Sequence, residues 1–378
     1  MKFETKAIWV GQAADQATGA TIVPIYQTST FTQEEINKHK GYEYSRVDNP
    51  TRSALDECLA SLEEGKYGLT FSSGLAAEHA IFSMLRPNDH VVVPIDMYGG
   101  TYRLIKLILE PLNIKFTFTD FTDLKSIQDS FLPSTKMVWI ETPTNPILKI
   151  FDIAAIADYS RKKGVISVVD NTFATPYFQK PLILGADIVV HSTTKYINGH
   201  SDLIGGAVIV NDTELYEKIK LVQKSVGAVP SPFDSWLTLR GVKTLAVRMR
   251  QHEDNAMKVA IFLKQHPNAD EVYFPGLEEH PGHSIAKRQM TGFGGVVSFQ
   301  IKGGLAEANA FFKKLKVFQL ADSLGGVESL ANYSALMTHE AFPPELRRKI
   351  GVTENLIRLS VGIEHIDDLL SDLKEALN

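Results

Sequence analysis

Cysteine is almost absent from this chain: Cys58 is the only one in 378 residues. No intrachain disulfide can therefore form, which fits a reducing compartment. Cys58 recurs with Leu55, Leu59 and Leu62 at helical spacing. We therefore interpret it as a small core residue rather than as a catalytic thiol.

Long apolar runs and long basic runs are also missing. No segment approaches the roughly 18 consecutive apolar residues of a membrane span, and the N-terminus lacks the charged start and apolar stretch of a signal peptide. The net charge is −5 and no basic stripe is present, so we expect neither nucleic acid nor a membrane as a partner. We predict a cytoplasmic protein without a metal site.

The chain does contain an ordinary globular balance, with 44% hydrophobic and 22% charged residues, and its length suits two domains. Short apolar runs alternate with helical stretches, and runs such as Val91-Val92-Val93 indicate strands buried on both faces. This alternation predicts an α/β fold with a mostly parallel sheet, whose functional residues gather where the strands end. We predict strands at 68–72, 90–94, 115–119, 136–141, 165–170, 187–191 and 206–210, and helices at 75–85, 123–131 and 153–163.

The pattern indicates three parts of the chain. Residues 1–45 read as an extended N-terminal arm that would contact a neighbouring subunit. Residues 46–232 form a large domain, whose first helix starts at Asn49-Pro50 because asparagine caps helices and proline fits their first turn. Residues 233–378 form a smaller α+β domain. Its predicted elements are a long helical stretch at 234–265, strands at 296–301 and 356–361, and a closing helix at 366–377.

The segment from Asp187 to Ser201 carries the strongest chemical signal. A short apolar run leads to Ser192, Thr194 and then Lys195. The two hydroxyls can bind a phosphate, and a lysine removed from water can lose its proton and become an amine nucleophile. An aldehyde cofactor that carries its own phosphate needs this combination, so we infer pyridoxal 5′-phosphate (PLP) as the cofactor.

Two further segments follow predicted strands and suit the same cofactor. Asp170 ends one strand, where its carboxylate would pair with a protonated pyridine nitrogen; the alternative is a turn residue. Gly74 and Leu75 open a predicted helix, whose N-terminus favours an anion such as phosphate.

Three other side chains suit the ring and the substrate. Tyr98 follows a strand and offers an aromatic plate with a hydroxyl for proton transfer; the alternative is a half-buried core tyrosine. Asn145 lies in a rigid turn, where its amide can reach a ring hydroxyl or a substrate carboxylate. Arg358 lies in a very apolar strand, where a cation is costly unless it meets an anion. A substrate carboxylate suits its bidentate fork, and a structural salt bridge is the alternative.

Together these segments resemble the Cys/Met-metabolism branch of the PLP-dependent enzymes, which comprises cystathionine γ-lyases, γ-synthases and β-lyases. The resemblance covers nearly the whole chain, from Tyr42-Glu43-Tyr44-Ser45-Arg46 and Asn49-Pro50-Thr51-Arg52 to the segment from Asn355 to Gly362. The segment around Lys195 matches the family's lysine signature. The resemblance implies the fold type I of PLP-dependent transferases, with a seven-stranded sheet in the large domain, and a homotetramer built from two active dimers.

The resemblance also implies a role for each matching residue. Lys195 would carry the cofactor covalently, Asp170 would pair with its ring nitrogen, and Tyr98 would stack on the ring. The phosphate would be bound by Gly74, Leu75, Ser192 and Thr194, with Tyr44 and Arg46 reaching across from a neighbouring subunit. The substrate carboxylate would be bound by Arg358, Asn145 and Ser323, with Asp322 near a distal amine.

A few positions bear on the reaction itself. Leu324 resembles γ-type members, and Gly100 lacks the cysteine that methionine γ-lyases have there. The segments 227–232 and 287–289 look most like γ-lyases. Asp322 stands where γ-type enzymes usually have glutamate, so the contact to a distal amine is expected to differ.

Lys224 likewise stands where γ-lyases often have asparagine, so one contact at the pocket edge is expected to differ. We predict a cystathionine γ-lyase, which acts on a small sulfur amino acid. The alternatives are a cystathionine γ-synthase, then a β-lyase, and, in a different class, a non-catalytic binding protein on the same fold.

Overall fold

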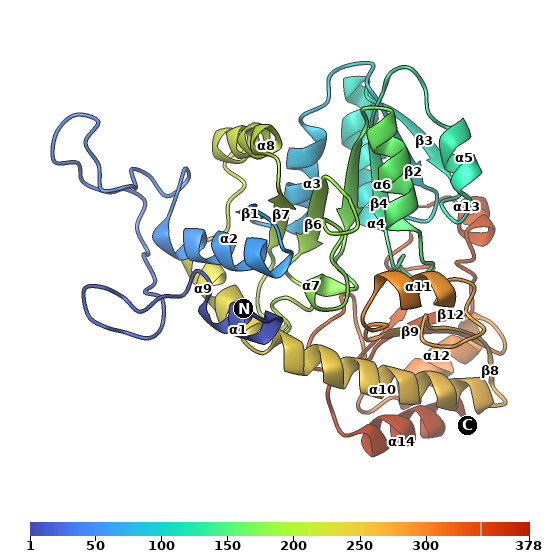
Figure 1. Ribbon diagram of the computed structural model, residues 1–378. Helices are drawn as coiled ribbons and strands as arrows, with labels where there is room; N and C mark the ends of the chain where they lie inside the picture. The colour runs from blue at the N-terminus through green and yellow to red at the C-terminus, as the bar shows by residue number, and fades with distance from the viewer. Residues whose placement is uncertain (341) are drawn as a thin grey trace.

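The computed structural model describes residues 1–340 and 342–378. In this part of the chain a seven-stranded sheet has the order β1-β7-β6-β5-β4-β2-β3 (Figure 1). Only β7 runs antiparallel to the strands beside it, so the predicted mostly parallel α/β sheet is confirmed. Its strands are β1 (Tyr67–Phe71), β2 (His90–Pro94), β3 (Lys115–Thr119), β4 (Thr135–Glu141), β5 (Ile166–Asp170), β6 (Ile188–Ser192) and β7 (Gly206–Val210).

Both faces of this sheet are buried, which explains the continuous valine run of β2. Val91 and Val93 pack in the core on the side of α3 (Gly74–Phe82), whereas Val92 packs on the side of α6 (Ile153–Lys162). All three valines are 0% exposed. Because parallel strands end at a common edge, the segments that follow β2, β4, β5 and β6 meet there.

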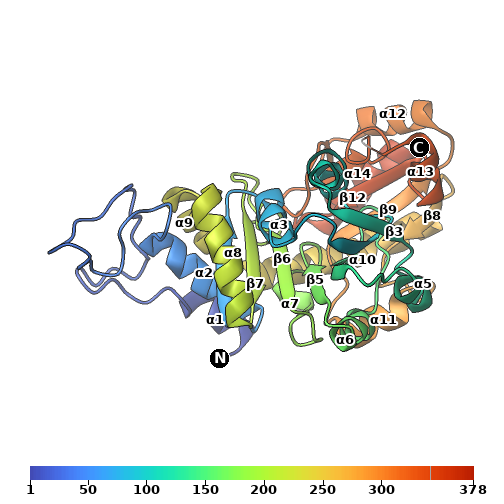
Figure 2. The same ribbon diagram turned by 90° about the horizontal axis from the view of Figure 1, so that it is seen from above.

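The C-terminal part of the chain forms a second, five-stranded sheet in the order β10-β11-β12-β9-β8. Two helices, α10 (Leu245–Gln265) and α14 (Ile366–Leu377), pack against one another beneath it (Figures 1 and 2). The predicted strands at 296–301 and 356–361 are present as β9 and β12. The strands are β8 (Ala269–Tyr273), β9 (Val296–Ile301), β10 (Gln319–Leu320), β11 (Leu330–Tyr333) and β12 (Leu356–Ser360).

The single helical stretch predicted at 234–265 is two helices, α9 (Pro232–Val242) and α10. At the break the Gly241 carbonyl oxygen, in the last turn of α9, accepts from the Thr244 N–H at 3.1 Å and from the Arg248 guanidinium at 3.0 Å. The same guanidinium donates to the carbonyl oxygens of Tyr196 at 2.7 Å and Ile197 at 3.3 Å. Arg248 therefore ties α10 to the turn that follows β6.

The remaining helices cover the two sheets and their connections. They are α1 (Phe3–Trp9), α2 (Pro50–Leu62), α4 (Gly99–Leu104), α5 (Leu124–Asp129), α7 (Thr175–Phe178), α8 (Thr213–Val226), α11 (His283–Gln289), α12 (Leu305–Lys314) and α13 (Pro344–Lys349). None of the helices in residues 1–340 and 342–378 is long and apolar enough to cross a bilayer.

The segment between α1 and α2 is an extended arm that projects away from both sheets (Figures 1 and 2). The prediction that residues 1–45 are extended throughout is wrong at their start, because α1 packs on α2 and buries Ala7. The predicted start of α2 is confirmed. The side chain of Asn49 accepts a hydrogen bond from the Thr51 N–H at 3.0 Å, and Pro50 is the first helical residue.

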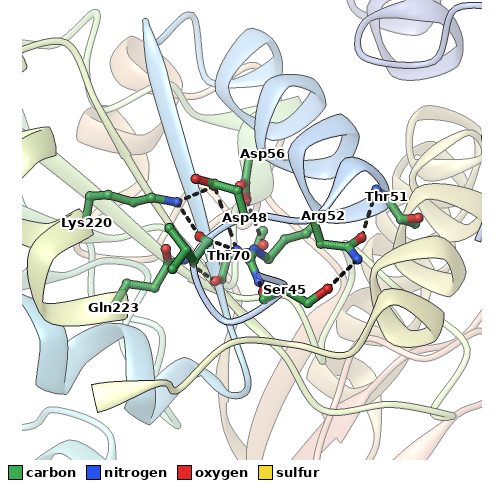
Figure 3. A network of polar contacts seen from close by, with 10 residues as sticks. Ser45, Asp48, Thr51, Arg52, Asp56, Thr70, Lys220 and Gln223 are labelled. Atoms are coloured by element: carbon green, nitrogen blue, oxygen red, sulfur yellow. Dashed lines mark hydrogen bonds and ion pairs between the residues drawn. The ribbon is translucent and has the colours of Figure 1, made fainter. Parts of the chain in front are cut away.

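A network of charges anchors the root of this arm (Figure 3). The buried Arg52 of α2 donates to the carbonyl oxygens of Ser45 and Val47, each at 2.6 Å. Lys220 of α8 pairs with Asp48 at 2.6 Å and donates to the Val47 carbonyl at 3.0 Å. The last residues of the arm are thereby held against α2 and α8.

The same network contains a carboxyl group that is costly to ionise. Asp56 of α2 accepts a hydrogen bond from the Thr70 hydroxyl of β1 at 2.7 Å, as Figure 3 shows. Burial raises the pKa of Asp56 to about 6, although the positive charges of Arg52 and Lys220 and the Thr70 hydrogen bond oppose this rise. Asp56 thus makes the native state pH-sensitive at a site remote from any substrate.

We predict that Asp56→Asn removes part of the pH dependence of stability. In the unfolded chain Asp56 loses its proton near its ordinary pKa of 3.8, whereas in the native state it does so near 6. As pH rises through this window, the free energy of unfolding falls by about 2 to 3 kcal/mol, because the unfolded state releases the proton first. Denaturant unfolding at several pH values should therefore show a weaker loss of stability for the variant.

A matched variant is Thr70→Val, which removes the hydrogen bond that lowers the pKa of Asp56. For Thr70→Val, the free energy of unfolding should go on falling to a higher pH than for the unmodified protein. Parallel stability curves for the unmodified protein and Asp56→Asn would contradict this interpretation.

Candidate active site

A cavity of about 750 Å³ opens where the strands of the larger sheet end, and the smaller sheet closes its other side. Most residues that the sequence singles out line this cavity. They are Gly74, Leu75, Tyr98, Asn145, Asp170, Ser192, Thr194, Lys195, Asp322, Ser323 and Arg358. Tyr44 and Arg46 do not line it: Arg46 lies in a separate groove at the root of the arm, next to Lys224.

Lys195 lies in the turn that follows β6 and points across the cavity. Its Nζ donates a hydrogen bond to the Ser323 hydroxyl at 2.9 Å. Burial, followed by the positive charge of Arg358, lowers the pKa of Lys195 to about 8, against the opposing effect of Asp322. A substantial fraction of this amine is therefore neutral, and hence nucleophilic, at mildly alkaline pH.

Arg358 lies in β12, in the smaller sheet, and is only 2% exposed. Its Nη1 donates to Asn145 Oδ1 at 2.9 Å and its Nη2 donates to the Ser323 carbonyl at 2.6 Å. Its Nε has no hydrogen-bond partner within the described residues. A buried cation with a donor to spare suits an anionic ligand, and no carboxylate of the described chain is hydrogen-bonded to it.

Ser323 is held in an unusual backbone conformation, with a φ of 90°. Such a conformation costs a non-glycine residue about 1 to 3 kcal/mol. It allows the Ser323 carbonyl to face Arg358 while the hydroxyl faces Lys195. The loop therefore supplies two contacts to the cavity from one residue.

The phosphate-binding groups predicted from the sequence lie together at one end of the cavity. A Cβ on Gly74 would lie 2.9 Å from the Ser192 Cβ, so only glycine allows the N-terminus of α3 to approach β6 this closely. The Thr194 hydroxyl donates to the Gly205 carbonyl at 3.2 Å and accepts from its N–H at 3.0 Å, which fixes the hydroxyl's orientation. Backbone N–H groups and hydroxyls converge here as an anion requires.

Asp170 lies at the end of β5 and accepts a hydrogen bond from the Thr172 N–H at 2.9 Å. Burial raises the pKa of Asp170, whereas its hydrogen bonds from Thr172 and the charge of His191 oppose that rise. His191 contacts Glu63 at 2.6 Å, and Asn171, which follows Asp170, donates to the same Glu63 oxygen at 2.7 Å. A buried polar set therefore fixes the strand ends that carry Asp170.

Glu141, at the end of β4, orients two of the predicted residues. One carboxylate oxygen accepts from the Tyr98 N–H at 2.7 Å, and the other accepts from the Asn145 N–H at 3.3 Å. Tyr98 has its ring beside Gly100, where an added Cβ would lie 2.3 Å from the ring carbon Cε1. A side chain at position 100 would therefore displace the tyrosine ring.

These residues fit PLP as a set. The cavity joins a cluster of phosphate-binding groups, an amine whose pKa is lowered, an aromatic ring and a buried carboxyl group for a pyridine nitrogen. The arginine with an unsatisfied Nε suits the carboxylate of an amino acid. Among the residues that the structure describes, no group of three or more His, Cys, Asp or Glu side chains could hold a metal ion.

Comparison with known proteins decides between the families that use such a site. The model of the Cys/Met metabolism PLP-dependent enzyme family matches residues 4–378. The chain belongs to this family. It is therefore an enzyme of cysteine and methionine metabolism that uses PLP.

The relatives of this family member have three different activities. The chain is 51% identical to a cystathionine γ-lyase of Dictyostelium discoideum, over 100% of this chain and 98% of the relative. It is 50% identical to a cystathionine β-lyase of Coxiella burnetii, over 99% and 97%. A solved cystathionine γ-synthase of Xanthomonas oryzae superimposes with a TM-score of 0.98 at 45% identity, over 100% and 98%. The trans-sulfuration class is thus established.

The sequence pattern missed two acidic residues of the cavity wall. Glu141 ends a predicted strand, and that position was the signal that could have drawn attention to it. Glu78 lies inside a predicted helix, where periodicity gave no indication that it faces a ligand cavity. The prediction that Cys58 is a core residue is confirmed, because it is 0% exposed and burial raises its pKa to about 12.

We predict that the amine of Lys195 titrates near pH 8 in the cofactor-free protein. Its rate of labelling by an amine-selective reagent, followed by peptide mass spectrometry, should rise about tenfold from pH 7 to pH 9 and then level off. Lys125 serves as the control, because its contact with Asp129 raises its pKa and its labelling should still increase beyond that range.

Arg358→Gln should move the Lys195 midpoint to higher pH, because the substitution removes a positive charge that disfavours the ammonium form. Labelling of Lys195 that rises in parallel with that of Lys125 would contradict the proposed environment.

Proposed function

We propose that this enzyme is a cystathionine γ-lyase, which converts cystathionine to cysteine, 2-oxobutyrate and ammonia. The observation that carries the proposal is Leu324, which lines the cavity directly after Ser323 and is 4% exposed. An aliphatic side chain there is the γ-type feature, whereas many β-lyases have a bulkier aromatic pair around this serine. The segments 227–232 and 287–289, which look most like those of γ-lyases, support the same proposal.

The proposed roles follow from the positions of the side chains. Gly74, Leu75, Ser192 and Thr194 would hold the phosphate of PLP. Asp170 would hold its ring nitrogen, Tyr98 would cover its ring, and Lys195 would bind it covalently. When bound, PLP supplies an electron-withdrawing ring that stabilises negative charge at the α-carbon of the substrate.

The remaining groups bind the substrate and move protons. Arg358 binds the substrate carboxylate, while Asn145 and Ser323 hold the guanidinium in place. The neutral Nζ of Lys195 removes the α-proton. Loss of a second proton, from Cβ, then allows the sulfur on Cγ to depart with a proton from Lys195 Nζ or Tyr98 Oη. Burial raises the pKa of Tyr98, which keeps this hydroxyl protonated until it is needed.

The contact of a distal substrate amine is proposed at Asp322. One of its carboxylate oxygens accepts from Asn332 Nδ2 at 3.0 Å, so the side chain has a fixed orientation in the cavity. Asp322 is one carbon shorter than the glutamate of most γ-type enzymes. A distal amine would therefore need to come closer to the loop that carries Ser323.

The N-terminal arm is proposed to complete the site of a neighbouring subunit. Tyr44 and Arg46 lie on its exposed side, within a cation–π distance of 5.5 Å from one another. They would reach the partner's phosphate site within a homotetramer of two active dimers. The large domain at 46–232 would bind PLP and the domain at 233–378 would close over the substrate, in an enzyme of the cytoplasm.

A cystathionine γ-synthase is the second candidate, because the synthase shares the same binding groups and ends differently, by adding cysteine to an activated homoserine. Product analysis separates the two. With cystathionine alone we expect 2-oxobutyrate and cysteine in equal amounts. Rapid cystathionine formation from an O-acyl-homoserine plus cysteine, with little 2-oxobutyrate from cystathionine, would replace the lyase by the synthase. Pyruvate from cystathionine would indicate a β-lyase.

We predict that Lys195→Ala abolishes the covalent attachment of PLP and lowers turnover by about 10³-fold or more, because the acid–base amine is lost. The absorbance near 420 nm, which reports the attachment, should be absent from the folded Lys195→Ala protein. Lys162→Ala, an exposed lysine paired with Asp158 on α6, is the control and should retain both properties. A colourless protein that binds a macromolecule would instead favour a non-catalytic binding protein.

A further inference from the structure

Glu78 is an acidic residue of the cavity that none of the roles above uses. It lies on α3, one helical turn after Gly74 and hence on the same side of the helix. Its side chain lines the cavity together with Asp170 and Tyr98. The residue is 4% exposed, and its Oε2 has no hydrogen-bond partner in the described part of the chain. A buried carboxyl oxygen without a partner, in a residue of the cavity wall, needs an explanation.

The contrast with Glu141 shows that Glu78 has a different task. Both oxygens of Glu141 accept backbone N–H groups, from Tyr98 and Asn145. That carboxyl group is therefore used to position the chain. Glu78 lacks such backbone contacts: its Oε2 is buried without a hydrogen-bond partner among the described residues, and the nearby Thr101 hydroxyl is the one hydrogen-bonding group that opposes the rise of its pKa. The protonation state of Glu78 therefore depends on the charges around it.

Negative charge dominates the surroundings of Glu78. The ionisable groups near it are Asp170 from β5, Glu141 from β4 and Tyr98 at the start of α4. Three cations of the described residues line the cavity: Lys195 and Arg358 have their polar contacts with Ser323 and Asn145, and Arg103 acts on Tyr98.

Among the elements packed on α3, α4 carries Arg103, whose charge acts on Tyr98 but is not among the charges that act on Glu78. His191 of β6 is bound to Glu63, Lys220 of α8 is bound to Asp48, and β7 has no ionisable residue. Three carboxyl groups around one small volume cannot all ionise in a poorly hydrated site.

We propose that Glu78 is held as a neutral carboxylic acid in the PLP pocket, where it limits the negative charge beside the ring nitrogen to that of Asp170 and so sets the alkaline limit of the site. Burial, followed by the charge of Asp170, raises the pKa of Glu78 well above its ordinary value, in agreement with this assignment. The inference rests on the ring-nitrogen role proposed for Asp170. Glu78 acts on the cofactor through charge and is a positioning residue.

The test compares the holoenzyme with Glu78→Gln, whose amide has nearly the shape of the neutral acid but cannot ionise. Near neutral pH the variant should bind PLP within about twofold of the unmodified affinity and have the same absorbance spectrum, because the charge is unchanged. Towards alkaline pH the unmodified protein should show a spectral transition and a change in PLP affinity, both of which the variant lacks.

Two outcomes would overturn the proposal. One is a Glu78→Gln protein whose PLP affinity near neutral pH is lower by about tenfold or more, which would mean that Glu78 is ionised there. The other is identical alkaline transitions in the two proteins. Glu253→Gln is the control, because this carboxyl group also has a pKa raised by burial but accepts the Phe293 N–H outside the cavity. It should titrate like the unmodified protein.

A measurement on the unmodified protein guards against a variant that fails to fold. Infrared spectra of the cofactor-free protein and of the PLP-loaded protein should each contain a band of a protonated carboxyl group at neutral pH. Its absence from the loaded state would refute the inference. Asp170→Asn distinguishes this failure from failure of the ring-nitrogen assignment: an unchanged ring spectrum in that variant would remove the role of Asp170 itself.

Discussion

The cavity depends on one buried cation. Arg358 lies in the middle of an apolar strand of the smaller sheet, yet one arm of its guanidinium reaches Asn145 from the larger sheet. The other arm holds the carbonyl of Ser323, whose hydroxyl meets Lys195. Its charge also helps to keep the lysine amine neutral. One side chain thus joins the two parts of the chain, holds the Ser323 loop and lowers the pKa of Lys195.

A second constraint acts on the acidic side of the cavity. Strands β4 and β5 end side by side, with Glu141 paired to Asp170 in register. Neighbouring parallel strands end at the same edge of the sheet, so the two carboxyl groups lie close together and each needs its own partner. Glu141 is satisfied by two backbone N–H groups, and Asp170 by Thr172 and, in the proposed function, by a cationic ring. The neutral state proposed for Glu78 completes the balance, since a second negative charge beside the ring nitrogen would have no counterpart.

Much of this arrangement could be predicted from the sequence, because it rests on local patterns. Uninterrupted valines identified β2, a polar turn after an apolar run identified Lys195, and a lone arginine in an apolar strand identified Arg358. What escaped prediction depends on contacts between distant segments. At the break between α9 and α10, Arg248 binds carbonyls of Gly241 in α9 and of Tyr196 in another loop, and the direction in which Glu78 points is set by how α3 packs on the sheet. Helical periodicity contains neither fact.

The clamp made by Arg248 has a mechanical consequence. The guanidinium grips the carbonyls of Tyr196 and Ile197, directly after the reactive lysine, while its helix α10 supports the strands β8 and β9. The turn that carries Lys195 and the strands β8 and β9 are therefore linked through α10. A shift of α10 along its axis would move the turn that carries Lys195. A disturbance on the outer side of that helix, far from the cavity, would therefore change the position of Lys195 Nζ.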